Sequence, residues 1–322
     1  MKPQPLPPTP RSTDVPALDR PAVSAACVAR VRRACPEHLP LAEQVLGQLD
    51  PARWTLEWFV PWWLGSLLAL DGEVTRQLVV SNVLGLASLR LQDDLADGEI
   101  AEDQVGDATA LSAMLYDEAV AVYRPLVGTH SPFWAVLAGA MAEWRAVTDD
   151  SATGRREVPT VRSLARRGAP LKISAYAACL LAERADLFPA IETCLDHALA
   201  ALVLHDHAQD WREDLSAGRW NAYVARLSRY PQDAQHRDQN RSAVLMAMMT
   251  SQATRRYYAR IDRESSHAAR LADRLDLWPL AAHLRGFGVR NVDHGTWLQQ
   301  RYHRHAEDAA AIVFGPAFGA QP

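Results

Sequence analysis

The chain has 322 residues, of which 48% are hydrophobic, so it is long enough to bury a sizeable core. Its formal net charge of −4 argues against a nucleic-acid-binding protein, because such proteins usually carry a basic surface. The four cysteines are scattered and lack CxxC spacing, which argues against a disulfide framework and against a zinc site.

The first 22 residues are rich in proline and contain no apolar stretch of the kind found in a secretory signal. We expect them to form a disordered arm, followed by a single domain over residues 23–322. The longest apolar run, "WFVPWWLGSLLAL", is interrupted by Pro61 and Gly65 and is shorter than the ~18–20 residues that span a bilayer. The sequence therefore predicts no transmembrane segment and a cytoplasmic protein.

The rest of the chain has a helical pattern. Apolar residues recur at spacings of three and four, and alanine and leucine, both good helix formers, dominate. The predicted helices cover residues 73–95, 108–123, 133–147, 171–184, 189–215, 241–276 and 279–305. Turn-forming residues separate them at 97–99, 128–132, 149–154 and 229–233. No alternating strand pattern is present, so the sequence predicts an all-α domain.

An acidic cluster, "LQDDLADGE", ends the first of these long helices. It contains Asp93, Asp94 and Asp97 in a D-D-x-x-D pattern, and the first and last of them share one helical face. Carboxylates are unfavourable at a helix C-terminus because the helix dipole is negative there. Solvent, basic neighbours or a divalent cation would offset this cost. Oxygen-rich sites of this kind suit Mg²⁺.

A second acidic cluster, "HDHAQDWREDLSAGRWN", follows the apolar run "ALAALVL". Asp206, Asp210 and Asp214 are spaced i, i+4 and i+8, so on one continuous helix they would stand on a single face and repel one another. Either cluster alone is most often a solvated helix end. Two such clusters, each after a long apolar helix, together indicate a metal site.

These two clusters resemble the metal-binding motifs of the class I isoprenoid synthases. This superfamily includes trans-prenyl diphosphate synthases, squalene and phytoene synthases, and class I terpene synthases. The resemblance implies a helical bundle around a deep apolar cavity, with the two motifs facing each other across its mouth. It also implies a prenyl diphosphate substrate and three bound Mg²⁺ ions, for which Mn²⁺ can substitute. Members of the superfamily commonly form homodimers.

The second cluster is most similar to the motif of squalene and phytoene synthases. That motif reads Asp-x-x-Glu-Asp followed by Gly-Arg and an aromatic residue. The matching positions are Asp210, Glu213, Asp214, Gly218 and Arg219. The resemblance assigns the metal ligands to Asp93, Asp94, Asp97, Asp206, Asp210 and Asp214.

Further matches imply residues that contact the diphosphate. "LKISAYAACLL" is similar to a Lys-Thr segment of prenyl diphosphate synthases, with Lys172 at the lysine and Ile173 in place of threonine. "WLQQRYHRH" contains Arg301 and Tyr302, which resemble the Arg-Tyr pair of terpene synthases. Together with Arg219 these residues are the expected catalytic group.

The basic run "VRSLARRGA" offers three candidates for an arginine that senses diphosphate. They are Arg162, Arg166 and Arg167, and the pattern does not choose among them. "RWTLEWFVPWW" places Trp54 and Trp58 four residues apart, where they would either line a cavity wall or pack in the core.

The function implied is that of a Mg²⁺-dependent class I terpene synthase, a lyase that ionises an allylic prenyl diphosphate. One alternative is a condensing enzyme of the squalene or phytoene kind, or another prenyltransferase. A remote alternative starts from the pair His205-Asp206, which resembles that of HD-type phosphohydrolases. His197, only eight residues upstream on the same predicted helix, cannot supply the further histidine that this family needs. A non-catalytic partner subunit of the isoprenoid fold is a third alternative.

Overall fold

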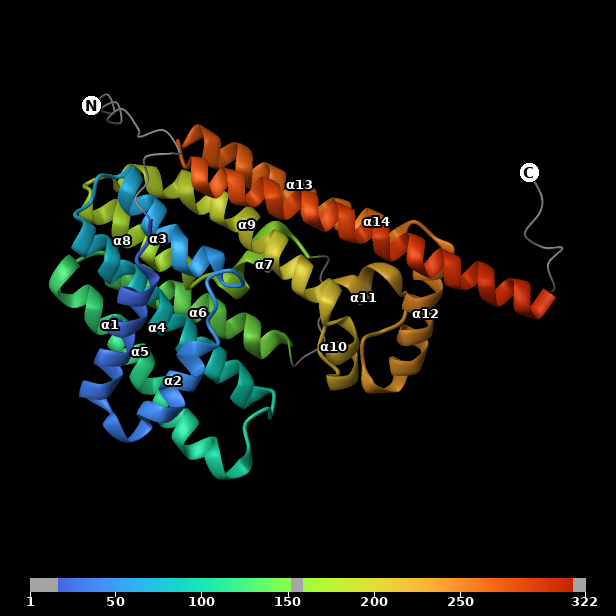
Figure 1. The fold of residues 1–322 in the computed structure, drawn as a ribbon, viewed down its shortest axis with the longest axis horizontal. Coiled ribbons are helices and arrows are strands. Elements are labelled where there is room, and N and C mark those ends of the chain that lie inside the picture. The colour runs from blue at the N-terminus through green and yellow to red at the C-terminus, as the bar shows by residue number, and fades with distance from the viewer. Residues whose placement is uncertain (1–16, 152–158, 315–322) are drawn as a thin grey trace. The chain divides into compact units, whose positions relative to one another are not determined.

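The computed structural model of the protein describes residues 17–151 and 159–314, with side chains for 17–147 and 159–308. Fourteen α-helices and five short 3-10 helices cover most of these residues, and no strand occurs among them (Figure 1). The predicted all-α fold class is confirmed. Most of the arm expected over residues 1–22 lies outside the described residues.

The helices bury apolar side chains that recur at helical spacing, and their bounds are as follows. The α-helices are α1 (Arg20–Ala34), α2 (Leu39–Gly47), α3 (Thr55–Leu67), α4 (Gly72–Ala96), α5 (Val105–Val127), α6 (Phe133–Ser151), α7 (Val161–Ala165), α8 (Leu171–Leu181), α9 (Phe188–Gln209), α10 (Trp211–Ala217), α11 (Ala222–Leu227), α12 (Arg237–Thr250), α13 (Ala253–Arg274) and α14 (Trp278–Phe314). The 3-10 helices are η1 (Pro36–His38), η2 (Glu102–Gln104), η3 (Arg166–Gly168), η4 (Ala185–Leu187) and η5 (Ala234–His236).

Helix α1 begins inside the stretch expected to be a disordered arm. The Asp19 side chain accepts a hydrogen bond from the Ala22 backbone N–H at 3.0 Å, and Pro21 lies in the first turn. Both residues favour a helix start, because the carboxylate satisfies a free N–H group and proline lacks one. The helix therefore includes the last three residues of the expected arm, 20–22.

Two predicted helices are each divided in two, and these are corrections. The predicted helix 189–215 breaks at Asp210, whose backbone angles (φ −97°, ψ 9°) end α9 and precede α10. The predicted helix 241–276 breaks at Ser251, which has an extended backbone. The Ser251 hydroxyl accepts a hydrogen bond from the Ala253 N–H at 3.2 Å and so begins α13.

The chain divides into two compact units. The first comprises residues 1–141, 169–192 and 274–280, and the second comprises 142–168, 193–273 and 281–322. The expected single domain over 23–322 stays a prediction.

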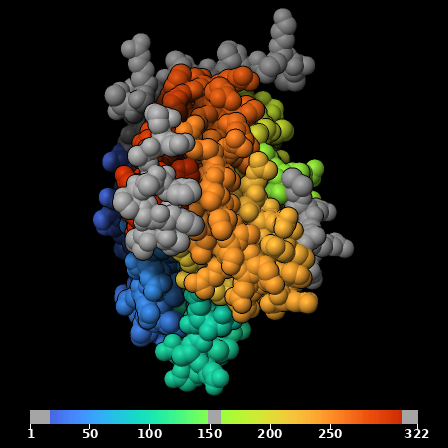
Figure 2. Space-filling model, turned by 90° about the vertical axis from the view of Figure 1, so that its right-hand side faces the viewer, coloured from blue at the N-terminus to red at the C-terminus, as the bar shows by residue number. Residues whose placement is uncertain are grey.

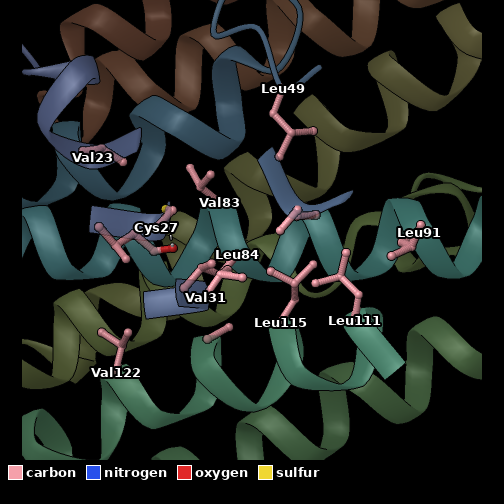
Figure 3. Close-up of a cluster of buried hydrophobic side chains, with 14 of the residues drawn as sticks. Val23, Cys27, Val31, Leu49, Val83, Leu84, Leu91, Leu111, Leu115 and Val122 are labelled. Atoms are coloured by element: carbon pink, nitrogen blue, oxygen red, sulfur yellow. Dashed lines mark hydrogen bonds between the residues drawn. The ribbon is translucent and has the colours of Figure 1, made fainter. Parts of the chain in front are cut away.

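In the first unit, α4 packs against α1, α2, α3, α5 and α8. Its buried Val83, Leu84 and Leu91 meet Leu111 and Leu115 of α5 in one apolar cluster (Figure 3). The Cys27 thiol of α1 lies in the same cluster and donates a hydrogen bond to the Val80 carbonyl oxygen of α4. This packing fixes the helix that carries the first acidic cluster.

In the second unit, α13 and α14 run side by side (Figure 1). They approach closely at Gly295, where an added Cβ would lie 2.5 Å from the Tyr258 Cβ. The buried Ser265 hydroxyl of α13 donates to the Leu284 carbonyl oxygen of α14. A second apolar cluster includes Trp211, Tyr223, Val244 and Tyr258, which come from α10, α11, α12 and α13. Figure 2 shows the outer surface of residues 237–274 in orange.

One helical stretch of the described chain, Ala185–Gln209, is long and apolar enough to cross a membrane by length and composition. Its mean hydropathy in the best window is 1.5, and 44% of that window is buried within the protein. Leu195, Ala198 and Leu204 on it are fully buried. A core helix of a folded domain passes the same test, so this helix is weak evidence for a membrane span.

Candidate functional site

The first acidic cluster lies at the C-terminal end of α4. Gly98, with φ +71°, ends the helix in the left-handed conformation that glycine adopts without strain. The Glu99 N–H donates to the Asp94 carbonyl oxygen at 2.9 Å, and the Gly98 N–H donates to the Leu95 carbonyl oxygen at 3.3 Å. These two bonds define a Schellman turn. Asp97 is exposed at the helix cap.

The side chains of this cluster have a basic neighbour on their own helix. The Arg90 guanidinium, one turn before Asp94, donates to its carboxylate at 2.9 Å. Arg90 also lies over the Trp54 ring, 5.8 Å from its centroid. Asp93 is half-buried on the same turn. An arginine therefore offsets part of the negative charge at the end of α4.

The second acidic cluster spans the junction of α9 and α10. Asp206 is exposed on the last turn of α9, Asp210 is exposed at the break, and Asp214 is half-buried on α10. The backbone bonds from Asp210 N–H to Asp206 O (2.8 Å) and from Asp214 N–H to Asp210 O (2.9 Å) keep the i to i+4 register. The three aspartates thus stand on two helices that meet at the middle one, rather than on one continuous face.

The second cluster ends in a Schellman turn like that of the first. Gly218 has φ +73°, the Arg219 N–H donates to the Asp214 carbonyl oxygen at 2.8 Å, and the Gly218 N–H donates to the Leu215 carbonyl oxygen at 3.4 Å. The two turns align residue by residue: "DDLADGE" over residues 93–99 matches "EDLSAGR" over residues 213–219. Asp94 and Asp214 occupy the equivalent position, and each is paired with an arginine.

Two side-chain hydrogen bonds hold the Asp214 carboxylate of the second cluster. Its Oδ1 accepts a hydrogen bond from the Arg219 Nε at 3.0 Å, and its Oδ2 accepts one from the Asn221 Nδ2 at 2.7 Å. Its side chain is 14% exposed. Both oxygens are therefore oriented by the segment that follows the Schellman turn.

His207, between Asp206 and Asp210, faces the interior. Its ring is buried, and its Nδ1 accepts a hydrogen bond from the Ala222 N–H at 3.2 Å. Burial, assisted by the positive charge of Arg167, lowers the pKa of His207 from its usual 6.5 to about 3. The ring is therefore neutral, with its proton on Nε2. Nε2 is a buried atom for which the described residues supply no hydrogen-bond partner.

The electrostatic effect of Arg167 on His207 also distinguishes the three candidate arginines. Arg167 is half-buried and near enough to act on the His207 ring, whereas Arg162 and Arg166 are exposed. Of the three, Arg167 is the one associated with the second acidic cluster.

Lys172 is buried on α8 in the first unit. Its Nζ lies 3.2 Å from the Glu192 Oε1 on α9, in the same unit. The sequence contains only one other lysine, Lys2. Lys172 and the first acidic cluster belong to one unit, and the second cluster belongs to the other.

Arg301 and Tyr302 lie on α14 in the second unit. The exposed Arg301 guanidinium stacks over the Trp297 ring, 5.3 Å from its centroid. The Tyr302 hydroxyl accepts a hydrogen bond from Arg212 of α10 at 3.1 Å. Tyr302 therefore contacts the helix that carries Asp214, while Arg301 packs on its own helix.

The donor atoms fit a hard cation. The six aspartates of the two clusters carry carboxylate oxygens at half-buried or exposed positions. Mg²⁺ usually takes one or two protein carboxylates, with waters and substrate phosphates completing its shell. Within residues 17–147 and 159–308, the only three His, Cys, Asp or Glu side chains whose ligand atoms lie within 4.8 Å of one another are Cys35, Glu37 and His38. Neither acidic cluster by itself therefore brings three carboxylates that close.

No family model, no curated protein and no solved structure matches the chain.

The sequence assigned no role to three residues that contact the acidic clusters in the structure. Arg90 could have been found, because an arginine four residues before Asp94 faces it on a helix. Asn221 had the signal of a helix N-cap, since asparagine favours that position. The buried contact between His207 and Ala222 has no sequence signal, because it depends on how α11 folds back on α9.

Proposed function

We propose that the protein is a Mg²⁺-dependent class I terpene synthase, which ionises an allylic prenyl diphosphate and releases diphosphate. The observation that carries this proposal is the repeated geometry of the two acidic clusters. The aspartates of the first cluster lie at the end of the apolar helix α4, those of the second run from the end of the apolar helix α9 into α10, and both clusters close with the same kind of glycine turn. The carboxylates at the end of α4 are disfavoured by the helix dipole by about 0.3–1 kcal/mol each, and a bound cation would remove that cost.

The candidate ligands are the oxygens of Asp93, Asp94 and Asp97 in the first unit and of Asp206, Asp210 and Asp214 in the second. When bound, Mg²⁺ stabilises the negative charge that develops on a leaving diphosphate.

The basic residues would supply donors for the same charge. Lys172 is buried and pairs with the Glu192 carboxylate, and Arg219 pairs with Asp214 of the second cluster. Such donors, fixed before reaction, stabilise charge without reorganising. Arg301 and Tyr302 are the further members of this group.

Turnover with defined substrates tests the proposal. The purified chain is incubated with farnesyl, geranylgeranyl and longer prenyl diphosphates, with Mg²⁺ or after exhaustive chelation, and both the extract and the released diphosphate are analysed. We expect a terpene product that requires Mg²⁺ or Mn²⁺. Full turnover after chelation would contradict a metal-dependent reaction.

Matched variants connect the reaction to the acidic clusters. Asp93→Asn and Asp210→Asn should each lower turnover by orders of magnitude and leave the fold intact. Asp117→Asn and Asp293→Asn change exposed aspartates on α5 and α14, away from the acidic clusters, and should leave turnover unchanged. Equal effects on turnover in all four variants would show that the acidic clusters have no specific role in the reaction.

The products also separate this reaction from a condensation. A second prenyl diphosphate is added as an acceptor in a parallel incubation. A longer product that forms only with the acceptor would indicate a prenyltransferase or a head-to-head synthase, which the Asp-x-x-Glu-Asp motif resembles.

A further inference from the structure

Asn221 is a buried side chain at the centre of the second acidic cluster. It is fully buried at the start of α11. Its Oδ1 accepts hydrogen bonds from the Tyr223 N–H at 2.8 Å and the Val224 N–H at 3.1 Å, which makes it the N-cap of α11. A cap needs only this oxygen, so serine or aspartate would serve equally well.

The Asn221 Nδ2 has a different role. It donates to the Asp214 Oδ2 at 2.7 Å and to the His207 carbonyl oxygen at 2.8 Å. One amide group therefore joins α10 to the end of α9, on either side of Asp210. These two bonds need a donor with two hydrogens that reaches both oxygens, and the side chains of serine and aspartate lack one.

The backbone of Asn221 is fixed as well. Its N–H donates to the Gln232 Oε1 at 2.8 Å, and its carbonyl oxygen accepts from the Gln232 Nε2 at 2.9 Å. The next residue, Ala222, donates its N–H to the His207 Nδ1. Because every polar group of Asn221 is bonded, its amide cannot turn without losing a buried hydrogen bond.

We infer that Asn221 is a positioning residue, which sets the orientation of the Asp214 carboxylate as a metal ligand. This inference rests on the proposed function for its metal-binding part. Its structural part, the coupling between Asn221 and Asp214, stands apart from any reaction.

The test compares Asn221→Ser with Asn240→Ser. Asn240 is also fully buried, belongs to the same unit, and donates its amide to a backbone carbonyl oxygen, that of Pro231. Binding of Mn²⁺ in the presence of pyrophosphate is followed by the electron paramagnetic resonance signal of free Mn²⁺, at a temperature where both variants are folded. We expect the affinity to fall at least tenfold in Asn221→Ser and less than twofold in Asn240→Ser.

A double variant tests whether Asn221 acts through Asp214. If it does, Asn221→Ser combined with Asp214→Ala should bind Mn²⁺ and pyrophosphate no more weakly than Asp214→Ala alone. Equal losses in Asn221→Ser and Asn240→Ser, or a further loss in the double variant, would overturn the inference.

Melting temperatures keep the two proposals separable. If the parent chain binds no Mn²⁺ with pyrophosphate, the proposed function fails, and the thermal data still decide on the coupling. We expect the melting temperature of the double variant to fall by less than the sum of the falls in Asn221→Ser and Asp214→Ala, because both changes remove the same hydrogen bond. Additive falls would show that the two side chains act independently and would overturn the inference.

Discussion

Lys172 and Glu192 form an ion pair in which the lysine is buried and the glutamate is partly open to solvent. The Nζ–Oε1 distance is 3.2 Å, and the two side chains are 10% and 44% exposed. A buried ammonium group is costly to desolvate, and an exposed partner returns little of that cost. In the proposed function, Lys172 also contacts the anionic diphosphate.

Replacing Lys172 by methionine should therefore separate stability from ligand binding. Methionine fills a similar volume without a charge, so we expect the melting temperature of Lys172→Met to be unchanged or higher. Stabilisation by pyrophosphate with Mg²⁺, which raises the melting temperature of a protein that binds them, should be lost. A variant that is stabilised by pyrophosphate as strongly as the parent would exclude Lys172 from the binding site.

Lysine carbon signals give a direct reading of the same site. Because Lys2 and Lys172 are the only lysines, a chain labelled with ¹³C at the lysine Cε shows one signal for each. Pyrophosphate with Mg²⁺ should shift the Lys172 signal and leave that of Lys2 unchanged, which makes Lys2 the internal control. Equal movement of both signals, or of neither, would contradict a role for Lys172 in binding.

The two Schellman turns predict matching losses of stability. Gly98→Ala and Gly218→Ala place a Cβ at φ +71° and +73°, where the surrounding space is open but the backbone is strained. Each should lower the free energy of unfolding by about 1–2 kcal/mol. Asparagine at either position should cost less, because it tolerates this conformation. Chemical denaturation measures the difference, and an alanine variant as stable as the parent would show that the turn can relax.

The approach of α13 and α14 predicts a steric effect at Gly295. An added Cβ would lie 2.5 Å from the Tyr258 Cβ, a part of that side chain that cannot rotate away. We expect Gly295→Ala to lower the free energy of unfolding by about 1–3 kcal/mol. Gly139→Ala is the control, because Gly139 is exposed in α6 with open space around it. This second change should stabilise the protein by about 0.5–1 kcal/mol, as alanine favours a helix.

The cysteines predict a simple pattern of thiol labelling. Burial raises the pKa of Cys27, Cys179 and Cys194 to about 12, so these thiols are protonated and shielded at pH 8. Only the thiolate reacts quickly with an alkylating or disulfide reagent. The native chain should therefore label at Cys35 alone, and the denatured chain at all four. Fast labelling of a second thiol in the native chain would contradict the packing of α1, α8 or α9.

Labelling of Cys35 should itself depend on Glu37. Partial burial and the hydrogen bond to Glu37 raise the pKa of Cys35 above its usual value, so its thiolate forms only at higher pH. Glu37→Gln removes the negative charge that disfavours the thiolate and should lower this pKa. The labelling rate at pH 8 should rise, and its pH profile should move to lower pH. An unchanged profile would show that burial alone sets the reactivity of Cys35.

The sequence by itself determined the helical fold class and most of the helices. Apolar spacing located α4, α5 and α6, and the glycine and proline clusters located the turns that follow them, because both signals act within a few residues of chain. The same local reasoning found both acidic clusters. It joined α9 to α10 and α12 to α13, since a break at one residue, such as Asp210 or Ser251, leaves the periodicity intact.

The tertiary structure alone decided which partners the charged side chains have on other helices. Asp214 accepts a hydrogen bond from Asn221, and the buried His207 ring accepts one from the Ala222 N–H, because α11 folds back on the end of α9. Lys172 meets Glu192 twenty residues further along the chain. Whether a carboxylate or an ammonium group is buried, paired or open to solvent depends on segments distant in sequence. No local pattern encodes that environment, and the chemistry of each group follows from it.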